Sequence, residues 1–460
     1  MLPALDGRFW NIMSTMQKNL TGTEPFVKHF SRVESMPQAD WLLALRRDGL
    51  AHFTELGIPT LAHEDWRFTN LAPLTKLPLE PLFETAATPE VAAFLAKQTF
   101  TKLPGSRLVF VNGRYAAELS VIGELPAGVK VTNLAAALKS DPEFVKAHLG
   151  ASADTGKNPF TALNQAFFLD GGFVHVPAGL AVAEPVQFIH VSTARKSGDT
   201  IQPRNLVVAE ANSRLTIVES YVSVVETAYF TNAVTELVAG ENATVEFVKY
   251  QAESPEAFHI GMMAAHLGRA SNVRIHSFAL GAKLSRTNIR TNLAGEGLEC
   301  ILNGLYLTRG EQLADHHMIV EHAQPHCASH EYFNGILDGK SKGVFHGRIL
   351  VREIAQKTDA KQTNKNLLLS DDATADTKPQ LEIYADDVKC THGATIGQLN
   401  NESIFYLRSR GIDTDTARRM LIHAFAGEIV ERVQCEAARE ELDKVVWDRL
   451  EANHNLAAKN

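Results

Sequence analysis

Cysteine is scarce in this chain of 460 residues. The four cysteines, Cys300, Cys327, Cys390 and Cys435, are too few and too scattered for a disulfide framework, which indicates a reducing compartment. No apolar run approaches the roughly 18 residues of a membrane-spanning helix, and the first residues lack the regions of a signal peptide. We therefore expect a cytoplasmic protein without a membrane segment.

An excess of positive charge is also missing. Lysine and arginine number 45 against 53 aspartates and glutamates, and the formal net charge is -8. This balance favours neither a nucleic acid nor a membrane surface as a partner. Hydrophobic residues make up 45% and charged residues 21% of the chain, which is typical of a folded globular protein and excludes global disorder.

The usual catalytic signatures are absent as well. Residues 150–158 resemble a phosphate-binding loop, but Asn158 stands where serine or threonine would reach Mg²⁺. We interpret this segment as a plain turn. Two His-Glu dipeptides, at 63–64 and 330–331, begin a zincin-like motif that lacks its second histidine. No hydrolase, kinase or redox activity of these kinds is predicted.

The hydrophobic pattern changes twice along the chain. Helical spacing dominates the first part, with a hairpin predicted to turn at Asn112-Gly113. From Gly172 to Leu399 the apolar residues alternate as in β-strands, and helical spacing then returns. We predict three parts: a mainly helical N-terminal region with a hairpin at 1–170, a β core at 171–399 and a helical C-terminal domain at 400–460.

Short alternating strands recur at regular intervals in the β core. Their first apolar residues are Leu215, Val245, Val273 and Leu298, which are 30, 28 and 25 residues apart. A loose period of this size, with Asn or Gly at the turns, favours a β-solenoid whose coils stack on one another. A β-sandwich is the alternative, but its turns come about every 8 to 12 residues.

A cluster of five histidines and one cysteine, His316, His317, His322, His326, Cys327 and His330, forms a first candidate metal site. On a strand, His316 and His322 share a face, and a helical turn after Pro325 would place His326 and His330 four residues apart on one face. Either pair could bind a metal ion. The alternative is that these histidines stack between coils and satisfy backbone groups near turns.

Cys390 and His392 form a second candidate. They lie two residues apart in an alternating segment, so both side chains would leave the same face of a strand. A thiolate with an imidazole suits iron or zinc, but two ligands are only half a site. The other ligands would have to come from a neighbouring coil or another subunit. A buried cysteine beside a hydrogen-bonded histidine is the alternative.

The C-terminal helical part carries an apolar face. An N-cap is predicted at Thr414, followed by apolar residues at helical spacing. This face is longer than the end of a solenoid would cover, so part of it is expected to contact a partner. The residues predicted on this face are Ala417, Leu421, Ala424, Phe425 and Ile429.

Longer motifs bring a family resemblance. The segments FNGILDGKSKGVFHGRILV from Phe333, AQKTDAKQTNKNLLLSDDATADTKPQLEIYADDVKCTHGATIGQL from Ala355 and FYLRSRG from Phe405 closely resemble the SufB/SufD family of iron-sulfur cluster assembly proteins. Weaker matches occur in HEDWRFTNL at 63–71 and GGFVHVPAG at 171–179. The chain is most similar to the SufD type.

This resemblance implies a right-handed parallel β-helix between helical N- and C-terminal parts. It implies a scaffold rather than an enzyme, which pairs with a SufB-like subunit and docks a SufC-like ATPase through its C-terminal helices. His392 matches the functional histidine of the family at the subunit junction, and Cys390 is its neighbour in the same motif. Asn364 stands where SufB-like subunits have a cysteine that receives sulfur.

Two consequences for cofactors and assembly follow from the resemblance. Iron or a nascent iron-sulfur cluster is expected in the complex, whereas the isolated chain is expected to hold no cofactor stably. The isolated chain could also form a homodimer. Two functions of other kinds stay open: a β-helix carbohydrate-active enzyme, which would need paired carboxylates in an open groove, and a metal-dependent enzyme that uses the cluster from His316 to His330.

Overall fold

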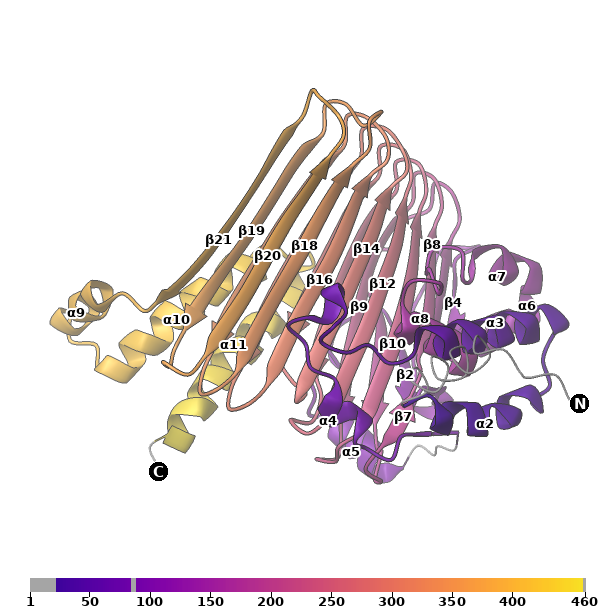
Figure 1. Ribbon diagram of the computed structural model, residues 1–460, viewed down its shortest axis with the longest axis horizontal. Coiled ribbons are helices and arrows are strands. Elements are labelled where there is room, and N and C mark those ends of the chain that lie inside the picture. Colours follow the sequence, from indigo (N-terminus) through magenta and orange to yellow (C-terminus); the bar gives the residue numbers. More distant parts are fainter. Residues whose placement is uncertain (1–21, 84–87, 458–460) are drawn as a thin grey trace, which may run out of the picture.

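Two long sheets wind around a common core in the computed structural model, which describes residues 22–83 and 88–457, with side chains as far as residue 450 (Figure 1). The N-terminal residues on which the absence of a signal peptide was predicted lie outside this range. The strands of sheet A in the coils are β5 (Gly172–Val176), β7 (Asp199–Ile201), β8 (Arg204–Ala209), β10 (Phe230–Ala239), β12 (Phe258–Leu267), β14 (Leu284–Leu293), β16 (Leu313–His322), β18 (Lys342–Val351) and β20 (Thr374–Ile383). Those of sheet B are β6 (Val186–Ser192), β9 (Arg214–Ser223), β11 (Thr244–Ala252), β13 (Asn272–Ala279), β15 (Glu299–Thr308), β17 (Ala328–Leu337), β19 (Asp359–Leu368) and β21 (Lys389–Gln398).

The strands of the two sheets alternate along the chain, so each full coil gives one strand to each sheet. Neighbouring coils pair in parallel and in register from β8 to β20 and from β6 to β21. Apolar side chains from both sheets form one continuous core between them. The predicted β-solenoid is therefore confirmed, and the sandwich alternative is wrong.

The register tests the predicted spacing residue by residue. Leu215 pairs with Val245, Val245 pairs with Val273, and Val273 pairs with Cys300. The first three predicted positions are therefore equivalent, but the fourth, Leu298, is wrong by two residues. Leu298 is buried in the turn before β15. Because Leu298 and Cys300 have the same parity, a period of two residues cannot tell which one begins the strand.

Four short strands of the N-terminal part extend the two sheets ahead of residue 170. The predicted hairpin is confirmed: Val111 pairs with Arg114 around Asn112 and Gly113, both of which have the positive φ of a type I′ turn. β2 pairs in parallel with β6, while β4 pairs antiparallel with β5 and β1 pairs with β7. These strands are β1 (Glu80–Pro81), β2 (Ser106–Val111), β3 (Arg114–Tyr115) and β4 (Lys130–Asn133).

Helices of the N-terminal part cover the first coils. They are α2 (Glu24–Glu34), α3 (Asp40–Leu56), α4 (Ala72–Thr75), α5 (Pro89–Leu95), α6 (Leu134–Ser140), α7 (Pro142–His148) and α8 (Pro159–Phe167), with 3-10 turns at Glu64–Trp66 and Ala117–Leu119. Apolar residues of α3, α6 and α7 pack on β5 and β8. The helix α8 lies between α3 and β10, and all its residues are buried.

The segment that resembled a phosphate loop ends at the N-terminus of α8. Asn158 is the N-cap of that helix, and its side-chain oxygen accepts hydrogen bonds from the backbone N–H groups of Phe160 and Thr161. The backbone N–H of Gly150 donates to the buried carboxylate of Glu236 at 2.8 Å. The loop thus binds an internal carboxylate with the kind of N–H groups that a phosphate loop offers to its ligand.

A second segment of the N-terminal part, residues 63–71, crosses the outer face of sheet A between α3 and α4 (Figure 1). We call it the strap. Thr69 Oγ1 donates a hydrogen bond to Asp315 Oδ2 at 2.5 Å, and Lys378 Nζ lies 2.7 Å from Glu64 Oε1. The strap is therefore anchored to two coils that lie 246 and 314 residues after it in the sequence.

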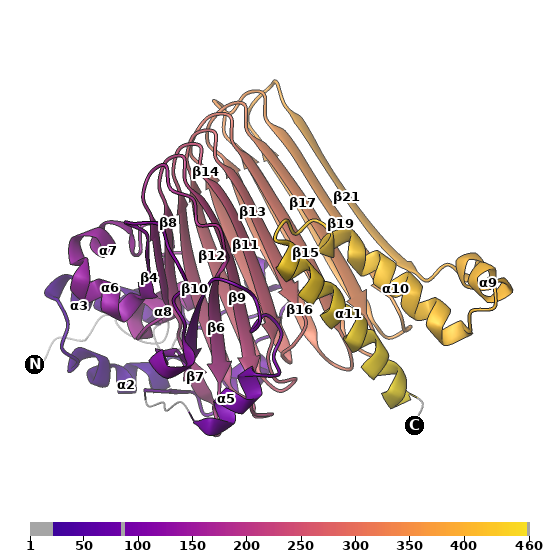
Figure 2. The same ribbon diagram turned by 180° about the vertical axis from the view of Figure 1, so that it is seen from behind.

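The C-terminal helices are α9 (Asn401–Ser409), α10 (Thr414–Val430) and α11 (Glu436–Ala457), and α10 and α11 lie along the outer face of sheet B (Figure 2). The predicted N-cap at Thr414 is wrong by one residue. Asp413 caps α10 and accepts hydrogen bonds from the N–H groups of Asp415 and Thr416. Asp and Thr are both good N-caps, so the sequence alone leaves this choice open. None of the described helices is long and apolar enough to cross a membrane.

Candidate functional site

The last coil of the solenoid has two open strand edges. β20 ends sheet A and β21 ends sheet B, so within the described residues no further strand pairs with them. Almost every residue of β21 is exposed, whereas every residue of β6 near the other end is buried. The backbone N–H and C=O groups along such an edge can pair with another chain.

Cys390 and His392 lie on β21 at the open end of the solenoid interior. Cys390 pairs with Ala360, and His392 pairs with Gln362. Because Ala360 and Gln362 are buried between the sheets, residues of the same columns on β21 point towards the interior, with no further coil above them. The predicted strand and the shared face are confirmed, and the role as ligands stays a prediction.

A carboxyl group lies two coils before His392 at the equivalent interior position, because His392 pairs with Gln362 and Gln362 pairs with Glu331. Gln362 Nε2 donates a hydrogen bond of 2.7 Å to Glu331 Oε2, and burial raises the pKa of Glu331 to about 7. Burial also raises the pKa of the Cys390 thiol. This thiol is therefore mainly protonated at neutral pH, and it becomes a ligand only when a metal ion displaces its proton.

His316 and His322 share a face of β16, as predicted, but this face is the solenoid interior. His316 Nε2 is 2.9 Å from Ser277 Oγ, and His322 Nε2 is 2.8 Å from Ser329 Oγ. Burial lowers the pKa of His316 to about 3 and that of His322 to about 4. Both rings are therefore neutral at physiological pH, and each is hydrogen-bonded to a different serine.

The predicted helical turn with His326 and His330 is wrong. His326 has a φ of +58° in the turn between two coils, and His330 lies on β17. A coil of the solenoid needs a sharp reversal after Pro325, so the chain enters a strand there instead of a helix. His326 lies 3.9 Å from Glu296 and His330 lies 3.7 Å from Asp359, so the two rings have different partners.

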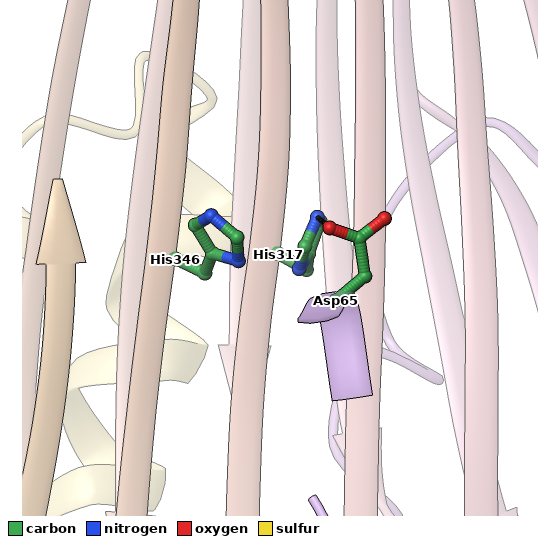
Figure 3. A group of neighbouring side chains, drawn as sticks. All are labelled: Asp65, His317 and His346. Atoms are coloured by element: carbon green, nitrogen blue, oxygen red, sulfur yellow. Dashed lines mark ion pairs between the residues drawn. The ribbon is translucent and has the colours of Figure 1, made fainter. Parts of the chain in front are cut away.

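A different group of possible metal ligands comes together on the outer face of sheet A, beneath the strap (Figure 3). His317, His346 and Asp65 each offer one ligand atom, and these atoms lie within 4.8 Å of one another. His317 belongs to the predicted cluster, but neither predicted pair contains it. Local spacing cannot reveal this group, because Asp65 is about 250 residues away and because strand alternation pairs His316, not its outward-facing neighbour, with His322.

Two family models match this chain. The SufBD protein N-terminal region matches residues 23–188, and the SufBD core domain of the SUF system for FeS cluster assembly matches residues 190–425. The chain belongs to the SufBD family. The core match covers most of the solenoid, including the whole last coil and its motif around Cys390 and His392.

Curated relatives agree with this assignment. An iron-sulfur cluster assembly SufBD family protein of Synechocystis is 36% identical, over 88% of this chain and 91% of its own length. The iron-sulfur cluster assembly protein SufD of Escherichia coli is 32% identical over 87% of this chain and 91% of its own. SufD of Bacillus subtilis is 29% identical over 94% of this chain and 99% of its own.

Asn364 of this SufBD protein is fully engaged in hydrogen bonds inside the solenoid. Its Nδ2 donates to the carbonyl oxygen of Phe333 at 3.1 Å and lies 3.2 Å from the hydroxyl of Tyr306, while its Oδ1 accepts from Asn366 Nδ2 at 2.7 Å. An amide has no nucleophilic sulfur. The position that the resemblance assigns to sulfur acceptance is therefore structural in this chain.

The predicted apolar face of α10 in this SufBD protein is only partly correct. Ala417 and Ile429 are buried, Leu421 and Phe425 are half-buried, and Ala424 is exposed. The buried face of α10 is rotated from the predicted one, because it packs on β15, β17 and α11 along the side of the solenoid instead of capping its end. The buried residues of α10 are Ala417, Ile422, Ala426, Ile429 and Val430.

Proposed function

We propose that this chain is the SufD-type scaffold subunit of a SUF complex. In this proposal it pairs through its last coil with a SufB-like subunit, docks a SufC-like ATPase through its C-terminal helices, and helps to hold iron or a nascent cluster at the junction. The observation that carries the proposal is the open last coil, which has Cys390 and His392 at its mouth. A cytoplasmic location and the lack of an enzymatic activity of its own belong to the same proposal.

The surface of the open end supports pairing with another protein. Large apolar side chains are exposed around it, and apolar surface next to an unpaired strand edge favours association. A partner that added its own strand to β21 would satisfy the open backbone groups and cover this apolar surface. The exposed residues are Ile383, Tyr384, Ile396, Phe405 and Tyr406.

The chemistry at the junction needs a partner as well. Cys390 and His392 supply at most two ligands, and a four-coordinate iron needs more. A second subunit on the open edge would place its own side chains opposite this pair. Nucleotide chemistry is assigned to the ATPase, since the loop at 150–153 already binds the carboxylate of Glu236.

The pairing is tested with two matched substitutions at opposite ends of the solenoid. Ile396 on β21 is 49% exposed, and Val121 near β2 is 52% exposed. We expect Ile396→Asp to prevent co-purification with the SufB-like subunit, because it places a charge in an apolar interface. Val121→Asp should leave co-purification unchanged. Equal co-purification of both variants would contradict pairing through the last coil. Sedimentation of the isolated chain shows whether the same edge forms a homodimer.

Cluster assembly is tested on the complex co-expressed with its SufB-like and SufC-like partners. His392→Ala and His392→Gln should leave the complex assembled but remove most of its iron and sulfide, since an amide is a poor substitute for imidazole at iron. Cys390→Ser should have a smaller effect. The control is His266→Gln, an exposed histidine on β12. A full content of iron and sulfide in the His392→Ala complex would show that His392 is a packing residue.

ATPase docking is tested on the exposed side of α10. Ala424→Asp should reduce co-purification of the SufC-like ATPase without unfolding the chain, because Ala424 is exposed. The matched control is Ala93→Asp, an exposed alanine on α5. If both variants retain the ATPase equally, the docking surface lies elsewhere.

A further inference from the structure

We infer that His317, His346 and Asp65 form a binding site for a divalent transition-metal ion on the outer face of the solenoid. This site lies on sheet A under the strap and is separate from the junction at Cys390 and His392 on sheet B. It does not depend on the proposed scaffold function.

The first argument is the way in which the fold brings the three side chains together. His317 on β16 and His346 on β18 are register partners in adjacent coils, and their ring centroids are 4.2 Å apart. Asp65 enters from the strap, with Oδ1 3.8 Å from His317 Nε2. In Figure 3 the His317 ring lies between the His346 ring and the Asp65 carboxylate. Small side-chain rotations would bring the ligand atoms to the metal bond lengths of about 2.0–2.2 Å.

The second argument is the hydrogen bonding of the two rings. His346 Nε2 lies 2.6 Å from the side-chain oxygen of Gln380, so this nitrogen carries the proton and the other keeps its lone pair. Such a contact to the far nitrogen is how proteins orient a metal-binding histidine. The His317 ring is only 7% exposed, yet its buried Nδ1 has no hydrogen-bond partner among the described residues. No hydrogen bond of Nδ1 therefore fixes the tautomer of His317, so Nε2, which lies towards Asp65, can present its lone pair to an ion.

The third argument is the local charge. Arg286 pairs with Asp315, Arg348 with Glu382 and Lys378 with Glu64, while Arg290 shares Asp154 with Lys157. The carboxylate of Asp65 forms no ion pair with a lysine or arginine of the described residues, so it stays available to a cation beside the two imidazoles. The site is thus suited to a cation.

The donor set selects the class of metal. Two imidazoles and one carboxylate suit Fe²⁺, Co²⁺ or Zn²⁺, whereas Mg²⁺ and Ca²⁺ prefer oxygen ligands alone. Arg286 Nη1 donates a hydrogen bond of 2.8 Å to the backbone oxygen of Asp65, and its guanidinium stacks on Trp66. The strap therefore holds Asp65 in place before any metal arrives. A bound ion would connect the strap to two coils of the solenoid.

The test is an anaerobic titration of the purified, metal-stripped full chain with Co²⁺, followed by visible absorption. We expect one equivalent to bind saturably and to be displaced by Zn²⁺. His346→Gln and Asp65→Asn should each weaken the affinity about tenfold or more. His266→Gln, which changes an exposed histidine elsewhere on sheet A, should leave the affinity unchanged.

The same titration of the Cys390→Ser/His392→Ala variant separates this site from the junction. This variant should still bind one equivalent of Co²⁺, and its spectrum should lack the charge-transfer absorption of a thiolate ligand. Bound Co²⁺ should also raise the melting temperature of that variant, but not after Asp65→Asn is added. If His346→Gln does not fold, Asp65→Asn alone decides the result, since its side chain is 55% exposed. Absence of saturable binding, or unchanged affinity in the site variants, would overturn the inference.

Discussion

The two ends of the solenoid are built from the same kind of coil but end in opposite ways. At the first coils, helices and the loop at 150–153 cover the strands, and β6 and β8 are buried along their whole length. At the last coil, β20 and β21 carry open edges, and their side chains are half-buried or exposed. A stack of coils needs a cover at each end, because an exposed edge can pair with other chains. Residues 22–83 and 88–457 supply a cover at the first coils but not at the last one.

The largest expected effect comes from the buried ion pair at the covered end. Glu236 accepts hydrogen bonds from the Arg204 guanidinium, at 2.6 Å to Nη2, and both side chains are fully buried. Glu236→Ala should lower the free energy of unfolding by about 3 to 5 kcal/mol, because it leaves a buried cation without its partner. Urea denaturation measures this change, and a loss below about 1 kcal/mol would contradict the role of the pair.

A second effect at the covered end depends on pH. His190 is stacked between Phe110 and Tyr221, and burial lowers its pKa to about 3 from 6.5. Below pH 6.5 the unfolded chain therefore binds a proton that the folded chain does not, so this contribution to stability is lost as the pH falls from about 6.5 towards 3. Phenylalanine cannot bind that proton.

When the pH is lowered from about 8 to about 5, the free energy of unfolding of His190→Phe should therefore rise by roughly 2 kcal/mol relative to that of the wild type. The comparison of urea denaturation at the two pH values cancels the change in packing, which is the same at both. The exposed His266→Gln serves as the control. The same difference from the wild type at both pH values would show that His190 does not titrate as stated.

Two cysteines at equivalent positions of different coils allow the buried interior of the solenoid to be compared with its open end. Cys300 is fully buried and its pKa is raised by burial to about 12, whereas Cys390, in the same column on the last coil, is only half-buried. Cys300→Ser should destabilise the chain by about 1 to 2 kcal/mol, because it buries a hydroxyl among apolar groups. Cys390→Ser should change the stability by less than about 0.5 kcal/mol. Thermal unfolding of both variants would show whether the two positions differ.

The smallest effect is expected for an ion pair at the open end. Lys357 and Asp387 form an exposed pair in the turns beside the last coil. Asp387→Asn should lower the free energy of unfolding by less than about 1 kcal/mol, because both side chains are exposed to solvent and the attraction is screened. A loss as large as that of Glu236→Ala would remove the contrast between the two ends.

The architecture could be predicted because a solenoid repeats its pattern locally. Leu215, Val245 and Val273 are equivalent in the structure, so the first residues of the strands suffice to predict a period of about 30 residues. They do not predict the exact register of β15, because Leu298 and Cys300 both fit the alternation of that strand. The N-cap of α10 was wrong by one residue for a similar reason, since Asp413 and Thr414 can both cap a helix.

Local spacing also predicts one candidate site but not the other. Cys390 and His392 are neighbours in sequence, and strand alternation alone placed them on one face. The alternation was also correct for His316 and His322, but it does not tell which face is the interior. The group of Asp65, His317 and His346 needs both the coil register and the docking of the strap, and neither is encoded in local spacing.

The strap also sets an order of events during synthesis. Each new coil contacts mainly the coil just made, so the solenoid can form as it leaves the ribosome. The strap can dock only in steps, because Thr69 pairs with Asp315 on β16, whereas Glu64 pairs with Lys378, 314 residues further along the chain. At about 5 to 20 residues per second, Glu64 waits for tens of seconds before its partner is made. A truncated chain that lacks residue 378 can still bind the strap through Asp315 but never closes the second pair, so the Glu64–Lys378 pair indicates that almost the whole stack has been completed.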